Sequence, residues 1–566
     1  MRAVPTWFGA PDRPLLGWCH LPDDGSARGV AVLCGPLGRE RANALPALQA
    51  LGDRLARSGV ATLRFDYAGT GDSAGNLDEP GRMADWLASI DHALALARSI
   101  NTGPVVVVGM RMGALLAAEA VRHGKPVDGL VLWDPCASGR EFLRIERTLL
   151  ATGYGASQVG DGSVTGPAFT YGPETVEELT PLALDPTPDT IAARTLVLAR
   201  SEGRSMPAAR AAFAAPHIDW IEVGGQPDLL DVPPQLLAVP TTTIKAIAEW
   251  TAEVVDVPES AVHFESVDRA VVATGPDGRE IAERTTWLGP NRLFGVVTEP
   301  CPATGAASPM VVLLSAGALD HTGPGRKWVD LARGFAADGI PTLRVDFDGI
   351  GESYGRSGFA RQIPKPPESI DDLEDLAGAL GDPEGRNLIF VGLSSGGYHA
   401  VEAGLHLHPL GVCAINPALS SLVPEVDQLD PDEPAQGFPD ARRRAYRPMP
   451  EMLKQLSVKH RRVANGLWRA LLQVRVTHSP AHAVAGVSRR GTPVLLINSA
   501  SDAVDFEPSA YWSLVTGRLH RHGLLDVEVV PGDDHSLYTL EGQSDAYPLL
   551  TRWIVDRAGA AAGTPG

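Results

Sequence analysis

Short apolar runs rich in Val, Leu and Ile recur along the chain, each bounded by Gly, Pro or Asp and followed by a stretch with helical periodicity. Continuous apolar runs of this length are typical of strands buried on both faces. Their alternation with helices predicts a mostly parallel sheet with helices on both sides. We therefore expect an α/β fold over nearly the whole chain.

The same pattern occurs twice in the same order. GVATLRFDYAGTGDS at 59–73 matches GIPTLRVDFDGIGES at 339–353, with eight of fifteen positions identical at an offset of 280 residues. Three further pairs of segments keep nearly this offset: 29–38 with 310–319, 105–120 with 388–403 and 129–135 with 411–417. A fourth pair, 195–200 with 493–498, follows in the same order at a larger offset. Five blocks in a constant order indicate a tandem duplication.

The junction between the copies is expected near residue 256. Segment 241–254 has apolar residues at helical spacing and predicts the closing helix of the first copy. Segment 262–289 predicts two strands around a turn at Pro276-Asp277-Gly278, which would open the second copy. The predicted domains are residues 1–255 and 256–566.

The second copy contains a G-x-S-x-G sequence, GLSSG at 392–396, between a predicted strand and a predicted helix. In that context the motif forms a sharp turn that holds its serine clear of the sheet edge. A serine hydroxyl is a weak nucleophile at neutral pH, and it needs a base that is itself oriented by an acid. Ser394 is the candidate nucleophile.

The acid and the base are expected further along the chain, in that order. The strand at 493–498 leads to Asp502, the candidate acid, with Asp505 as the alternative. The strand beginning near 524 leads to a loop with His535, the candidate general base. The donors for a developing oxyanion are expected to be the backbone N–H groups of Ser395 and Ala318, with Gly317 as neighbour.

These residues resemble the α/β-hydrolase superfamily, and the resemblance covers nearly the whole chain, twice. DFDGIGES at 346–353 is similar to the D-x-x-G-x-G-x-S loop of its esterase, lysophospholipase-like and serine-aminopeptidase-like branches. The His-Gly that the family usually has in the oxyanion loop is Ala316-Gly317 here. The resemblance implies hydrolysis or transfer of an ester, thioester or amide acyl group without a metal or an organic cofactor.

The first copy lacks the corresponding groups. Its motif is GMRMG at 109–113, so Arg111 stands at the serine position, and Arg is no acyl nucleophile. Alignment of 223–228 with 530–535 puts Asp228 at the base position. Alignment of 34–38 with 316–320 puts Pro36, which has no N–H, at the oxyanion-donor position. We predict a catalytically degenerate domain, either a packing partner or one in which Arg111 binds an anionic group.

About 70 residues of the second copy, 421–490, fit no core strand. They comprise a Pro-rich stretch and a helical stretch with an apolar stripe, in the place where this fold carries a cap. We expect a helical cap on the second domain. The run Arg442-Arg443-Arg444 within it is a solvated face or a contact for an anionic substrate.

Composition narrows the class of partner. The net charge of −19 disfavours nucleic acid and anionic membrane surfaces. Five scattered cysteines without a CxxC pair indicate neither a disulfide framework nor a zinc site. The N-terminus has no signal-like apolar core, and no apolar run reaches the roughly 18 residues of a membrane span. We expect a cytoplasmic protein that acts on a small or carrier-bound acyl substrate.

Three functions remain open at this stage. The first is a serine hydrolase that acts on an ester or a thioester. The second is an acyltransferase with the same triad, in which an alcohol or an amine replaces water. The third is a non-catalytic binding or scaffold protein. The acyl group and the oligomeric state are not encoded in these motifs.

Overall fold

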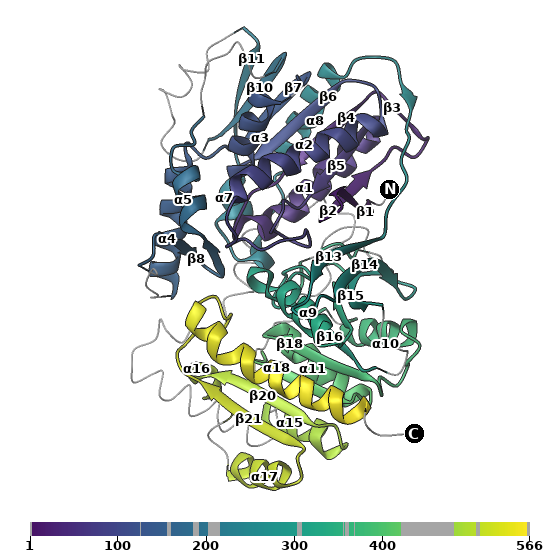
Figure 1. The fold of residues 1–566 in the computed structure, drawn as a ribbon, viewed down its shortest axis with the longest axis vertical. Helices are drawn as coiled ribbons and strands as arrows, with labels where there is room; N and C mark the ends of the chain where they lie inside the picture. Colours follow the sequence, from purple (N-terminus) through teal and green to yellow (C-terminus); the bar gives the residue numbers. More distant parts are fainter. Residues whose placement is uncertain are drawn as a thin grey trace. The chain divides into compact units, whose positions relative to one another are not determined.

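The chain is seen here as a computed structural model, shown in Figure 1. It describes residues 3–124, 126–154, 160–184, 192–201, 216–302, 308–354, 356, 362–366, 368–419, 480–504, 506 and 510–562.

The chain forms two compact units. The first comprises residues 1–233, 237–274 and 282–285, and the second comprises 234–236, 275–281 and 286–566. The domain boundary at residues 255 and 256 stays a prediction; by their contacts, residues 256–274 lie with the first unit.

The first unit is built on an eight-stranded sheet with the order β1-β2-β5-β4-β6-β7-β10-β11. Its first two strands form an antiparallel hairpin, and β2 is antiparallel to β5, whereas the remaining neighbours are parallel. Every residue of β4 to β7 is buried, and these strands are apolar except at Thr62 and Arg64 of β5. The strands are β1 Val4–Ala10, β2 Arg13–His20, β4 Gly29–Cys34, β5 Val60–Phe65, β6 Val105–Met110, β7 Gly129–Trp133, β10 Arg194–Arg200 and β11 Ile218–Val223.

Helices cover both faces of this sheet (Figure 1). One face packs against α2 Arg82–Ile100 and α3 Met112–His123, and the other against α1 Glu40–Arg57 and α8 Thr241–Val254. The predicted closing helix at 241–254 is therefore confirmed. Further short elements follow β7 and β11: α4 Gly139–Tyr154, β8 Val164–Gly166, β9 Phe169–Tyr171, α5 Pro173–Leu179 and α7 Gln226–Leu230.

The second unit contains most of a nine-stranded sheet with the order β13-β14-β15-β17-β16-β18-β19-β20-β21. Its last eight strands repeat the order found in the first unit, which confirms the predicted duplication of the fold. The expected hairpin at 262–289 is also present, as β13 and β14. The strands are β13 Arg269–Thr274, β14 Glu280–Leu288, β15 Leu293–Cys301, β16 Met310–Leu314, β17 Thr342–Val345, β18 Leu388–Leu393, β19 Gly411–Ile415, β20 Val494–Ser499 and β21 Leu525–Val530.

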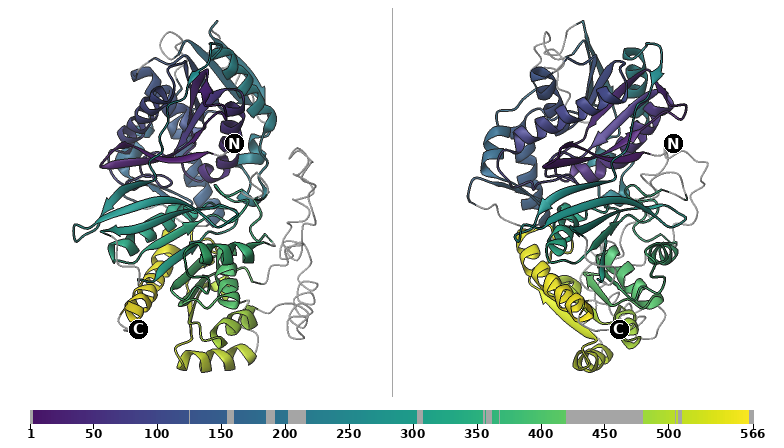
Figure 2. Two further views of the ribbon diagram at one scale, coloured as in Figure 1. Left: turned by 90° about the vertical axis from the view of Figure 1, so that its right-hand side faces the viewer. Right: turned by 45° about the vertical axis from the view of Figure 1, so that its right-hand side comes forward.

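Helices also lie on both faces of the second sheet (Figure 2). One face packs against α10 Ser369–Ala379, α11 Ser395–His406 and α15 Pro480–Arg489, the other against α9 Lys327–Ala337 and α18 Leu540–Ala562. The remaining helices are α16 Ala500–Ala503 and α17 Ala510–Arg521. The expected cap at 421–490 lies outside the described residues up to 479.

The described residues bear on the predictions about cysteines, metal sites and membrane spans. All five cysteines are free; four of them are buried, and Cys301 is half-buried. Within the described ranges, no helix is both long and apolar enough to cross a bilayer. Nor does the described part of the chain group three His, Cys, Asp or Glu side chains as ligands for a metal ion.

Candidate active site

The strand β18 meets the helix α11 at Ser394, which has the strained backbone angles φ 57° and ψ −114°. Two glycines make this tight turn possible. A Cβ atom on Gly392 would lie 2.0 Å from the carbonyl oxygen of Gly396, and one on Gly396 would lie 2.3 Å from that of Leu314. The sequence G-x-S-x-G therefore follows from the close approach of turn, helix and neighbouring strand.

The structure brings together the three residues that the sequence singled out. His535 Nε2 lies 2.9 Å from Ser394 Oγ, and His535 Nδ1 lies 2.7 Å from Asp502 Oδ1. The imidazole can thus donate its Nδ1 proton to the carboxylate and accept the serine proton at Nε2. The side chain of His535 is 43% exposed. The alternative acid, Asp505, lies outside the described residues.

These three side chains come from three loops at one end of the sheet. Ser394 follows β18, Asp502 lies in α16 directly after β20, and His535 lies between β21 and α18. The carboxyl ends of neighbouring parallel strands meet at one edge, so residues 141 positions apart come within hydrogen-bond distance.

The expected oxyanion donors lie in the loop after β16 and at the start of α11. The Gly317 N–H donates to Ser395 Oγ at 2.8 Å, so this N–H is already engaged. The Ala318 N–H donates no hydrogen bond to any residue that the structure describes. The Ser395 N–H belongs to the first turn of α11, where backbone donors have no partner within the helix. Ala318 and Ser395 therefore remain the predicted donors.

Sequence reasoning missed a buried pair beside this loop. His321 donates from its backbone N–H to Asp346 Oδ1 at 2.6 Å, and its Nδ1 lies 2.9 Å from Asp346 Oδ2. Burial raises the pKa of Asp346, and the neighbouring His321 opposes that shift. In the first copy the guanidinium of Arg41 binds the carboxylate of Asp66, at 2.8 Å. The pair ties the loop after the first parallel strand to the D-x-x-G-x-G-x-S loop in both copies.

This recurrence corrects one prediction about the first copy. Cys34 pairs with Phe65 and Leu314 with Val345, which keeps the offset of 280 up to Arg41 and His321. Pro36 lies two residues beyond Cys34, whereas Ala318 lies four residues beyond Leu314, so Pro36 does not stand at the position of Ala318. The prediction that proline removes the oxyanion donor in the first copy was wrong, because the sequence alignment was shifted by two residues in this loop.

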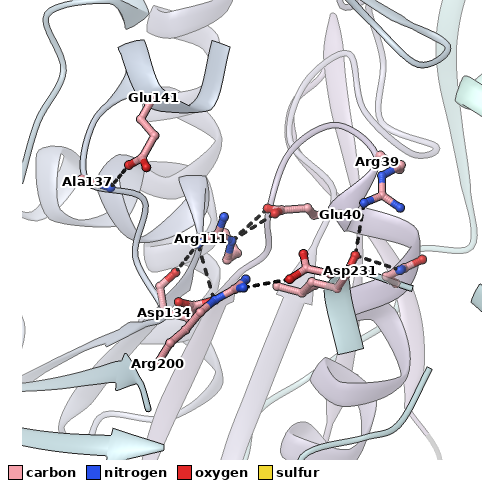
Figure 3. Close-up of polar contacts among 10 residues, drawn as sticks. Arg39, Glu40, Arg111, Asp134, Ala137, Glu141, Arg200 and Asp231 are labelled. Carbon is pink, nitrogen blue, oxygen red and sulfur yellow. Dashed lines mark hydrogen bonds and ion pairs between the residues drawn. The ribbon is translucent and has the colours of Figure 1, made fainter. Parts of the chain in front are cut away.

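Arg111 nevertheless occupies the nucleophile position, with φ 56° and ψ −121°. Its Nε donates to both oxygens of Glu40 at 3.1 and 3.2 Å, and its Nη1 donates to the carbonyl oxygen of Asp134 at 3.0 Å (Figure 3). The Asp134 carboxylate also binds Arg200 at 2.7 Å. Burial raises the pKa of Asp134 to about 6, although Arg111 and Arg200 oppose this shift. The positive charge of Arg111 is thus neutralised by Glu40 and Asp134 of the same unit. This arrangement does not support the alternative in which Arg111 binds an anionic group.

The base position of the first copy carries a carboxylate, as predicted. Arg200 pairs with Val223 and Ser499 with Val530. Asp228 and His535 therefore stand at the same distance beyond their strands. The first copy therefore has neither a hydroxyl at the position of Ser394 nor an imidazole at the position of His535.

A buried carboxyl group near Gly38 gives the first unit a predicted pH dependence. Glu146 of α4 is 2% exposed, and burial raises its pKa to about 8 from the ordinary value of 4.5. The folded state therefore holds this proton more tightly than the unfolded state. The resulting stabilisation is complete below about pH 4.5 and is lost as the pH rises to about 8.

Glu146→Gln, which keeps the shape without the charge, is expected to reduce the loss of stability between these pH values. Urea unfolding of the full chain at several pH values measures this effect. The exposed Glu177→Gln on α5 is the matched control and should follow the wild type. An unchanged pH slope in Glu146→Gln would contradict the assignment.

Family comparisons match both halves of the chain. The alpha/beta hydrolase family model matches residues 311–547. The model of the serine aminopeptidase family S33 matches residues 42–170. No curated protein sequence matches the chain significantly.

Several solved structures are similar to a little under half of the chain. Est1E from Butyrivibrio proteoclasticus, bound to ferulic acid, is 18% identical over 44% of this chain and 99% of its own, with a TM-score of 0.35. An esterase domain from Rhodothermus marinus is 15% identical over 45% and 99%, with a TM-score of 0.33. A putative hydrolase from Agrobacterium vitis is 18% identical over 45% and 98%, with a TM-score of 0.29.

The two family matches fall on different copies, and the two sheets share one strand order. The fold predicted from the repeat and the families matched by each copy therefore agree. The chain belongs to the α/β-hydrolase superfamily, and its first copy matches the serine-aminopeptidase branch.

Proposed function

We propose that the second domain is a serine hydrolase that cleaves an ester or a thioester through an acyl-enzyme on Ser394. The observation that carries the proposal is the pair of hydrogen bonds on His535, 2.9 Å to Ser394 and 2.7 Å to Asp502. A hydroxyl, an imidazole and a carboxylate in this order form the relay that activates a serine. The substrate is a small or carrier-bound acyl compound.

In the proposed first step, Ser394 Oγ attacks the acyl carbon while its proton passes to His535 Nε2. The N–H groups of Ser395 and Ala318 stabilise the oxyanion of the tetrahedral intermediate. His535 then gives the proton to the leaving oxygen or sulfur, and the acyl group stays on Ser394. Water gives a proton to His535 and attacks the acyl carbon. The bond between that carbon and Ser394 Oγ then breaks, His535 returns the proton to Oγ, and the acid is released. His535 carries each proton, Asp502 orients the imidazole, and the two backbone N–H groups stabilise the developing charge, so the proposed reaction needs no cofactor.

Labelling with a fluorophosphonate probe tests the proposal directly. The wild-type chain should be modified on Ser394, because the probe reacts only with an activated serine, and Ser394→Ala should not be labelled. Ser544→Ala, at an exposed serine on α18, serves as the matched control and should label like the wild type. Absence of labelling in the wild type, or equal labelling of Ser394→Ala, would favour a non-catalytic scaffold.

A further inference from the structure

Asn416, which the chemistry above does not use, lies behind the proposed triad. It directly follows β19, is 1% exposed and has φ 42°. Its backbone N–H donates to the carbonyl oxygen of Ile497 at 2.8 Å. The residue before it, Ile415, accepts a hydrogen bond from the Ser394 N–H at 2.9 Å. The backbone at this point is therefore hydrogen-bonded both to Ser394, at the end of β18, and to β20, the strand that leads to Asp502.

The Asn416 side chain joins the loops of the acid and the base. Its Nδ2 donates to the carbonyl oxygen of His535 at 2.8 Å, and its Oδ1 accepts from the Ser499 N–H at 2.6 Å. These partners define the orientation of the amide, since a carbonyl only accepts and a backbone N–H only donates.

Ser499 continues the connection to the acid. Its hydroxyl donates to Asp502 Oδ2, whereas Asp502 Oδ1 faces His535 Nδ1. Hydrogen bonds therefore form a closed circuit through Asn416, Ser499, Asp502 and His535. Asn416 and Ser499 are each 1% exposed, and satisfied hydrogen bonds between buried groups hold their partners in one geometry.

The first copy provides an internal comparison. The residue after β7 is Asp134, which has the same left-handed backbone, φ 46°, and the same backbone bond to the neighbouring strand, at 2.8 Å. Arg200 replaces Ser499, and the Asp134 carboxylate binds Arg200 and Arg111 instead of a loop carbonyl. The fold thus forms without the amide circuit, and the circuit occurs only in the copy with the Ser-His-Asp residues.

We infer that Asn416 is a positioning residue. Together with Ser499, it holds the loops that carry Asp502 and His535 at the separation needed for proton transfer. This inference rests on the proposed function. Loss of one hydrogen-bonded support lets His535 and Asp502 drift, and a shift of about 1 Å in a catalytic group lowers the rate about 100-fold.

Two variants of Asn416 test the inference in the full-length protein. Asn416→Ala is expected to lower the rate of fluorophosphonate labelling and kcat for a p-nitrophenyl ester about 10- to 100-fold, with little change in KM. Asn416→Asp keeps the shape and the acceptor for Ser499. It also places a negative charge beside the His535 loop, which favours the imidazolium, so the acid limb of the kcat/KM–pH profile should move to higher pH.

The matched control is Asn387→Ala, which removes an asparagine bond to the carbonyl oxygen of Ser308, at 3.1 Å, at the start of β18. It should leave the rates and the pH profile at wild-type values. Wild-type rates with an unchanged pH profile in both Asn416 variants would overturn the inference while the proposed function stands. If Asn416→Ala does not fold, the near-isosteric Asn416→Asp decides through its pH profile. An unlabelled wild type would instead refute the proposed function.

Discussion

Replacing His535 with alanine is expected to lower the rate of ester hydrolysis about 10⁶-fold, as much as removing Ser394 does. The serine hydroxyl cannot lose its proton at neutral pH without the imidazole at 2.9 Å. Because both residues act in one step, the double variant should be no slower than either single variant. Asp502→Asn should cost about 10⁴-fold, since it leaves the imidazole in the wrong tautomer. Steady-state hydrolysis of a p-nitrophenyl ester measures all four rates.

The control for this series is His406→Ala. The His406 side chain is 42% exposed, close to the 43% of His535, and it lies against Glu402 on the surface of α11. It should hydrolyse the ester at the wild-type rate. A His535→Ala variant that retains a tenth or more of the wild-type rate would show that another base takes the proton of Ser394.

Replacing Arg111 with methionine is expected to destabilise the first unit by about 3–5 kcal/mol, the usual effect of removing one partner from a buried charge pair. The substitution leaves Glu40 and Asp134, which are 12% and 6% exposed, without the guanidinium between them. Urea unfolding of the full chain, followed by tryptophan fluorescence, measures the change. Labelling of Ser394 should persist, because the first copy has no part in the proposed chemistry.

Arg98→Met is the matched control, because Arg98 is half-buried and its guanidinium bonds, among the described residues, to the carbonyl oxygen of Pro126 alone, at 3.1 Å. Its unfolding free energy should stay within about 0.5 kcal/mol of the wild-type value. Equal stability of Arg111→Met and the wild type would contradict the view that Arg111 neutralises the remnant of an active site. In that case its charge would be available for an external anion.

The sequence alone predicted the duplication, both sheets, the closing helix at 241–254 and the three side chains of the proposed triad. These features are encoded locally. Apolar runs define strands that are buried on both faces. The G-x-S-x-G turn needs glycine because a Cβ atom on Gly392 or Gly396 would lie within 2.3 Å of a backbone oxygen. The order of strands then places Asp502 and His535 at the same sheet edge as Ser394.

Only the tertiary structure revealed the contacts between side chains far apart in sequence. The bonds of Asn416 to Ser499 and His535 span 83 and 119 residues, and nothing in the sequence near Asn416 marks it. Likewise, the alignment that placed Pro36 at the donor position could be corrected only by strand registers and by the pair of Arg41 with Asp66. Such contacts depend on which strands are neighbours and in which register, and packing of the whole sheet determines both.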